Sequence, residues 1–294
     1  MDATNPSATP TAASRTPLHI GSVGMIVRDL EPMSAYYRHV LGLTELDRGK
    51  DSTKLGVGDV TLIELTRRPS ALPDDTREAG LYHTAFLMPT RRDHARWIVH
   101  VAKSRIPITG ASDHSVSEAI YLDDPEGNGI EVYNDRPRER WEYGGDGMIV
   151  MRTEPLDIEA IVREIDPATA TYPQAPEGLR IGHVHLRVGD IAQTEKFYRD
   201  AIGLDVVRKR GGASFMSSAG YHHHIGANVW HSQGAGPRND KRAGLDWVTI
   251  EINDQPTLDA LEQRLMSAGI ALRRIPNGLA AADPWGTRIR FVRA

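Results

Sequence analysis

A long internal repeat constrains the fold of this chain more than any other feature of its sequence. The segment LHIGSVGMIVRDLEPMSAYYRHVLGL, which begins at Leu18, aligns without a gap with LRIGHVHLRVGDIAQTEKFYRDAIGL, which begins at Leu179. Each copy opens with a strand-like stretch, continues with apolar residues at helical spacing and then runs into three short strands. We therefore expect the fold to be assembled from copies of one βαβββ unit.

Two weaker copies of the unit follow the strong ones. Gly80-Leu81 and Gly244-Leu245 open these copies, and Asp124-Pro125 matches Asp283-Pro284 ahead of the last strand of each. The sequence thus predicts an α+β fold of four βαβββ units, at 17–66, 80–133, 180–231 and 244–292.

The 294 residues are enough for two domains with full-sized cores. If consecutive units pair, the first domain covers 17–134 and the second 179–294. The Pro- and charge-rich connection 135–178 is expected to contain one short helix around Pro155–Ile165. Residues 1–16 lack an apolar segment, which indicates a disordered tail rather than a secretion signal.

Composition excludes several classes of function. The chain has no cysteine, so thiolate metal sites and cysteine nucleophiles are ruled out, and His, Asp, Glu and Tyr remain for metal chemistry. The formal net charge of −4 gives no basic face for nucleic acid or a membrane surface. No segment approaches the roughly 18 apolar residues of a membrane span. We expect a cytoplasmic enzyme that binds neither nucleic acid nor membrane.

Two polar residues stand in strands that are otherwise apolar. His83 lies in GLYHTAFLM, and Glu131 lies in the second of two strands joined by the turn Asp124–Asn128. An inward-facing histidine or carboxylate in such a strand is costly unless it is paired or bound. This pair is the first indication of a metal site.

Several short segments of the sequence resemble a known family. They are GLYH, SDHSVSEAIYL, DPEGNGIEVY, RPRERW, IGHVHLRV and AGYHHHIG. The chain is similar to the vicinal oxygen chelate superfamily, and within it to bacterial two-domain catechol 2,3-dioxygenases, which are type I extradiol enzymes. The resemblance implies two open, U-shaped mixed-sheet barrels in which two units close around one metal. It also implies that two histidines and one glutamate hold Fe(II), leaving adjacent positions for a catecholate and O₂.

The four units can be compared at the ligand positions that the resemblance implies. The first-strand positions are Ser22, His83, His183 and Trp247, and the last-strand positions of the second and fourth units are Glu131 and Arg290. Only units two and three together supply a complete set, His83, His183 and Glu131. This set requires unit two to pair with unit three within the chain, or units to be swapped between subunits. His19 is the substitute for His183 if the site lies within units one and two.

The resemblance also implies residues that handle protons and orient the substrate. The segment YHHHIGANVWH resembles a family strand with an acid/base histidine, and the alignment favours His223 over His222 or His224. His114 and Tyr121 are expected to bind the substrate oxygens.

These features predict an Fe(II)-dependent extradiol dioxygenase that cleaves a catechol with O₂ to a yellow 2-hydroxymuconic semialdehyde-type product. We expect it to act as a homo-oligomer, a dimer or tetramer. One alternative is a glyoxalase-like isomerase or thiol transferase. Glyoxalases usually need a second carboxylate near the metal, and the candidate positions carry none, because they are Ser22, His183 and Trp247. The other is a metal-free protein that sequesters a ligand.

Overall fold

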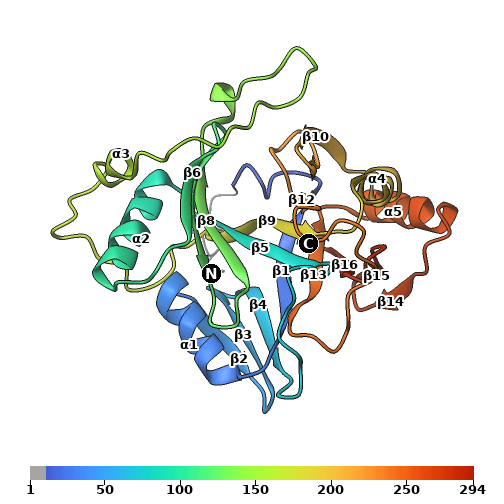
Figure 1. Ribbon diagram of the computed structural model, residues 1–294, viewed down its shortest axis with the longest axis horizontal. Helices are drawn as coiled ribbons and strands as arrows, with labels where there is room; N and C mark the ends of the chain where they lie inside the picture. The colour runs from blue at the N-terminus through green and yellow to red at the C-terminus, as the bar shows by residue number, and fades with distance from the viewer. Residues whose placement is uncertain (1–10) are drawn as a thin grey trace, which may run out of the picture.

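Two mixed β-sheets of eight strands each organise the computed structural model, which describes residues 11–294 (Figure 1). Each of the four expected units forms a strand, a helix and three further strands. Unit one consists of β1 (Leu18–Val27), α1 (Leu30–Leu41), β2 (Thr44–Arg48), β3 (Ser52–Val57) and β4 (Val60–Arg67). Unit two consists of β5 (Gly80–Leu87), α2 (Arg91–Lys103), β6 (Gly110–Asp113), β7 (Ser117–Asp123) and β8 (Gly129–Asp135).

The second half of the chain repeats this order. Unit three consists of β9 (Arg180–Arg187), α4 (Ile191–Glu195) with its π-helical continuation η2 (Lys196–Ile202), β10 (Asp205–Arg210), β11 (Ala213–Ser217) and β12 (Ile225–Asn228). Unit four consists of β13 (Gly244–Ile252), α5 (Gln255–Ser267), β14 (Arg273–Ile275), β15 (Gly278–Ala282) and β16 (Arg288–Arg293). The connection between the halves contains the 3₁₀ turn η1 (Arg138–Arg140) and the short helix α3 (Ile158–Val162), within the expected range.

The units pair across the two halves of the chain. One sheet has the order β14-β15-β16-β13-β1-β4-β3-β2 and joins unit four to unit one. The other has the order β10-β11-β12-β9-β5-β8-β7-β6 and joins unit three to unit two. First strands pair antiparallel at each centre, and the last strand of each unit runs parallel beside them. Unit two therefore pairs with unit three within the chain, which is one of the two expected alternatives. The expected domains 17–134 and 179–294 do not each form a sheet of their own, because each sheet contains strands from both ranges.

Local sequence signals explain where the helices begin and end. The side chain of Thr90 caps α2 by accepting a hydrogen bond from the backbone N–H of Asp93, and Asp254 caps α5 in the same way. Helix α1 ends at Leu41 and is capped by Gly42, whose positive φ of 69° suits glycine. The apolar faces of the helices cover the sheets, with α1 and α2 on one side of the molecule and α4 and α5 on the other (Figure 1). Among the described residues, no helix is long and apolar enough to cross a membrane.

A repeated tyrosine–aspartate bond ties neighbouring units together. The Tyr37 hydroxyl of α1 donates a hydrogen bond of 2.9 Å to buried Asp124, in the turn between β7 and β8. The Tyr198 hydroxyl of η2 donates one of 3.1 Å to buried Asp283, in the matching turn before β16. Each bond joins a helix beside one sheet to a turn of the other sheet. Asp124 therefore has the structural role expected of a turn residue.

The expected N-terminal tail is described only in part. Its first ten residues lie outside the described part of the chain. Residues 11–16 form turns in which Ala13 and Thr16 are buried, and the Ala13 carbonyl lies 3.1 Å from Nε2 of His224. These six residues belong to the folded structure.

Candidate metal centre and substrate pocket

The register of three adjacent strands brings His83, Glu131 and His183 together. Strand β5 lies between β8 and β9, and its residue Ala85 is opposite Glu131 on one side and His183 on the other. His83 is two residues before Ala85, so its side chain lies on the same face of the sheet. Nε2 of His83 lies 3.0 Å and Nε2 of His183 lies 3.2 Å from Oε2 of Glu131. All three side chains are buried.

The cluster has the chemistry of a site for a divalent cation. Nε2 of His83 is buried without a hydrogen-bond partner, although it lies close to the Glu131 carboxylate. An unpaired buried nitrogen is costly, and a metal ion bound between the three side chains would satisfy it. Two imidazoles and one carboxylate are suitable ligands for a transition metal.

The protonation states also suit metal binding. Burial alone would raise the pKa of Glu131, but contacts with His183 and His83 hold it well below its usual range. Burial lowers the pKa of His183 to about 4, against the opposing effect of Glu131. At neutral pH the cluster therefore offers an ionised carboxylate and a neutral imidazole, which are the forms that bind metal.

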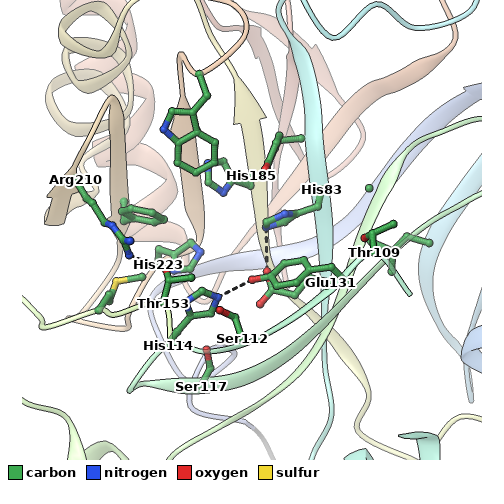
Figure 2. A pocket seen from close by; sticks show the side chains of 18 of the residues that line it. His83, Thr109, Ser112, His114, Ser117, Glu131, Thr153, His185, Arg210 and His223 are labelled. Carbon is green, nitrogen blue, oxygen red and sulfur yellow. Dashed lines mark hydrogen bonds and ion pairs between the residues drawn. The ribbon is translucent and has the colours of Figure 1, made fainter. Parts of the chain in front are cut away.

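A cavity of about 730 Å³ opens beside this cluster (Figure 2). His83 and Glu131 border it, while His183 is not among its lining residues. Its wall comes from both paired units and from the connection, which contributes Met151, Arg152 and Thr153. The candidate metal site is thus open to a ligand from one side.

Tyr121 and His114 form a hydrogen-bonded pair in the cavity wall. Tyr121 lies opposite Glu131 in the β7–β8 register. Nδ1 of His114 lies 2.7 Å from the Arg152 carbonyl, to which it must donate. In a neutral ring Nε2 is then an acceptor, and the Tyr121 hydroxyl 2.7 Å away donates to it. Burial and Glu131 raise the pKa of Tyr121 well above its usual value, so its hydroxyl stays protonated.

Of the three consecutive histidines, His223 borders the cavity. Its ring centroid lies 3.9 Å from that of His183, and burial with neighbouring imidazoles lowers its pKa well below its usual value. The two weighed alternatives, His222 and His224, are not among the lining residues. The expectation that the histidines lie within a strand is wrong, because β12 begins only at Ile225. The direction in which each of these histidine side chains points therefore cannot be deduced from the alternation of side chains along a strand.

His19 does not join the cluster. Its Nε2 lies 3.2 Å from Glu251 and its Nδ1 lies 3.3 Å from the Thr16 carbonyl, both at the sheet of units one and four. The weighed substitution of His19 for His183 therefore has no support in the geometry.

The sequence reasoning missed a further buried histidine of the cavity. His185 borders the cavity, its ring centroid lies 5.0 Å from that of His83, and its Nε2 accepts a hydrogen bond of 3.0 Å from Asn228. Burial, followed by the neighbouring imidazoles, lowers its pKa well below its usual value. The signal was present, because His185 is two residues after His183 and must share its face of the strand.

Sequence reasoning also missed a glutamate at the matching position of the other sheet. There Gly24 is opposite Glu64 and Trp247, as Ala85 is opposite Glu131 and His183. The matching set is therefore Ser22, Glu64 and Trp247. The Arg290 guanidinium covers the Trp247 ring at 3.7 Å from its centroid, so an indole and a cation occupy the space where ligands would be needed.

Fold and site together define a class: proteins of paired βαβββ units with a candidate metal site between two of them. The family model described as Glyoxalase/Bleomycin resistance protein/Dioxygenase superfamily matches residues 19–132 and 180–291. The chain belongs to this superfamily, as its sequence words predicted.

Individual relatives agree with this assignment. The chain is 38% identical to a protein named catechol-2,3-dioxygenase from Bacillus subtilis (strain 168), over 93% of this chain and 97% of the relative. A solved structure of a candidate dioxygenase from Bacillus subtilis subsp. subtilis str. 168 has a TM-score of 0.62 at 15% identity, covering 95% of this chain and 85% of that one. Glyoxalase I from Zea mays has a TM-score of 0.56 at 18% identity, covering 96% and 94%. These two structures show a shared fold.

Proposed function

We propose that this protein is an Fe(II)-dependent extradiol dioxygenase that cleaves a substituted catechol with O₂. The observation that carries the proposal is the buried cluster of His83, His183 and Glu131, open on one side to a cavity bordered by His223 and Tyr121. The 38% identity to the Bacillus subtilis catechol-2,3-dioxygenase supports the same reaction. When bound, Fe(II) would supply Lewis-acid and redox chemistry with open positions for both substrates.

The protein groups around the cavity have separate tasks. A catechol that binds as a monoanion must lose a proton, and His223, beside the cluster, can accept it and return it when the ring opens. Tyr121 and His114 share a hydrogen bond that can be redirected to the substrate oxygens. The burial of the cluster limits competition from water.

The size of the cavity favours a catechol that carries substituents. Its volume of about 730 Å³ lies within the range of roughly 300–1,000 Å³ that holds drug-sized ligands. Arg210 of β10 and Trp230 also line it, so the wall beyond the cluster includes a cationic and an aromatic side chain.

Oxygen uptake tests the proposal directly. Protein loaded with Fe(II) under anaerobic conditions is mixed with catechol or with alkyl- and aryl-substituted catechols, while absorbance follows a yellow ring-opened product. We expect oxygen consumption together with yellow product. Protein that holds iron but consumes no oxygen with any of these substrates would overturn the proposal and favour an isomerase or transferase.

A further inference from the structure

A buried chain of hydrogen bonds lies behind His223, away from the cavity. Nδ1 of His223 lies 2.8 Å from Nδ1 of His222, and Nε2 of His222 lies 2.9 Å from Oδ1 of Asp135. Asp135 is the last residue of β8, four positions after Glu131 on the same strand. His222 is fully buried and is not among the cavity-lining residues. The arrangement connects the candidate base to a carboxylate through one imidazole.

Proton counting along this chain fixes the tautomer of His223. An ionised carboxylate only accepts hydrogen bonds, so Nε2 of a neutral His222 must carry its proton and Nδ1 must be the acceptor. The facing Nδ1 of His223 must then donate, which leaves Nε2 of His223 without a proton. That nitrogen has no hydrogen-bond partner among residues 11–294, and His223 borders the cavity (Figure 2).

We propose that Asp135 and His222 are positioning residues that hold His223 in the tautomer with a free Nε2, ready to act as a base. This inference rests on the proposed dioxygenase function. In the step concerned, the O–H bond of a catechol hydroxyl breaks, its electron pair stays on the oxygen, and an N–H bond forms at Nε2 of His223. The opposite tautomer presents an N–H to the cavity and cannot accept this proton. In serine hydrolases, too, a carboxylate holds the histidine base in the required tautomer through a hydrogen bond.

His224, the third of the consecutive histidines, has different hydrogen-bond partners from His222 and therefore a different role. Nδ1 of His224 accepts a hydrogen bond from the backbone N–H of Ser218, and its Nε2 lies 3.1 Å from the Ala13 carbonyl. The contact with Ala13 anchors the N-terminal turns, and neither contact involves His223. Adjacent buried histidines in this segment are therefore not interchangeable.

The tautomer can be measured without metal or turnover. In metal-free, full-length protein labelled with ¹⁵N-histidine, long-range ¹H–¹⁵N correlation spectra show which ring nitrogen carries the proton, and the His223→Gln variant identifies the His223 signals. We expect Nδ1 to be protonated in the wild type. We expect this preference to be lost in His222→Leu and kept in His222→Asn, whose amide oxygen can accept in place of Nδ1. A proton on Nε2 in the wild type, or no change in His222→Leu, would overturn the inference.

Kinetics of the Fe(II)-loaded protein provide the second readout. We expect His222→Leu and Asp135→Ala to lower kcat about 100-fold with KM for catechol within about twofold of wild type, because base catalysis is lost and substrate binding is kept. The matched control is His94→Leu, since His94 is also fully buried and bonded through Nδ1, to Asn134 at 2.7 Å, but is not among the cavity-lining residues. An equal loss in the control, or a change confined to KM, would contradict the inference.

The two measurements separate this inference from the proposed function. If the wild type consumes no oxygen with catechols, the dioxygenase proposal fails, and the spectra still decide whether His222 sets the tautomer of His223. If the wild type is active and His222→Leu retains full kcat, the inference alone fails. Asp135→Ala provides a second variant if His222→Leu does not fold.

Discussion

At the scale of single residues, two glutamates occupy the same position in the two sheets and have different neighbours. Glu131 is buried against two histidine nitrogens, whereas Glu64 is half-buried and its strand neighbours place Trp247 where His183 would lie. A carboxylate becomes a candidate ligand only when the other donors are present. The side chains beside the glutamate therefore decide which sheet can hold a metal.

This contrast predicts the iron content of matched variants. Glu131→Ala and His183→Ala should lose nearly all bound iron, because each removes one of three ligands. Glu64→Ala and His19→Ala should keep the wild-type iron content, measured by a colorimetric iron assay after anaerobic loading and desalting. Iron loss in the His19 or Glu64 variant with retention in the His183 variant would place the site elsewhere.

A second prediction at this scale concerns acid stability. Burial lowers the pKa of His94 to about 4, with its bond to Asn134 and the charge of Glu118 opposing and Arg91 assisting the shift. The unfolded chain then binds a proton at higher pH than the folded one, so stability is full above about pH 6.5 and falls as pH drops towards 4. The loss from this residue should reach about 3 kcal/mol.

Urea unfolding at pH 7 and pH 4.5 checks this effect. The decrease in the free energy of unfolding between the two pH values should be smaller in His94→Leu than in the wild type. The exposed-histidine variant His39→Leu serves as the control and should keep the wild-type decrease. An unchanged decrease in His94→Leu would show that His94 does not titrate as inferred.

At the scale of secondary-structure elements, the helices and turns are positioned by contacts that the repeat duplicates. The Tyr37–Asp124 and Tyr198–Asp283 bonds occur at equivalent places, and both join a helix to the aspartate of an Asp-Pro pair that begins a turn. Both aspartates are buried and also accept backbone hydrogen bonds within their turns. The repeated pair thus fixes the helix–turn packing twice.

Removal of either tyrosine hydroxyl should weaken the fold. Tyr37→Phe and Tyr198→Phe should each lower the free energy of unfolding by about 1–3 kcal/mol, since each leaves a buried carboxylate with one donor fewer. The two effects should add in the double variant if the sites are independent. Chemical denaturation measures these changes, and Tyr143→Phe, at an exposed tyrosine, should have no effect. A neutral result for both variants would mean that water replaces the hydroxyls.

Much of this element-level structure could be predicted from the sequence, because the periodicities are local. The helix of unit two, the strands around His83 and Glu131, and the short helix after Pro155 all occur where the pattern placed them. The choice of partner strand is not local, so the sequence alone left two pairings open. The loop conformation of His222 and the contact between His222 and Asp135 also depend on tertiary packing.

At the scale of the whole molecule, the candidate metal site needs both halves of the chain. His83 and Glu131 come from unit two and His183 comes from unit three, and the central β5–β9 pair holds them in register. Each half alone would expose the edges of two first strands that pair across the molecule. The connection between the halves is thus not required to hold the ligands together, because strand pairing does so.

Splitting the chain tests this dependence. Residues 1–134 produced alone should bind no iron, because they lack His183. Production together with residues 135–294 should restore iron binding through the β1–β13 and β5–β9 pairs. Size-exclusion chromatography and iron analysis of the co-purified halves measure this outcome. Stable iron binding by the first half alone would contradict the assignment of His183.

The cross-pairing of the first strands has a consequence for chain connectivity. Leu18, at the start of β1, is opposite Ile252, and the backbone N–H of the last residue, Ala294, donates to the carbonyl of Ile252 at 3.0 Å. The start of β1 and the last residue of the chain therefore meet at one residue of β13. A linker that passes from Ala294 into the turns 11–16 ahead of β1 could join the two halves, and new termini could be opened in the 135–178 connection. Such a circular permutant, with its units in the order three, four, one, two, would retain both sheets and the same cluster of His83, His183 and Glu131.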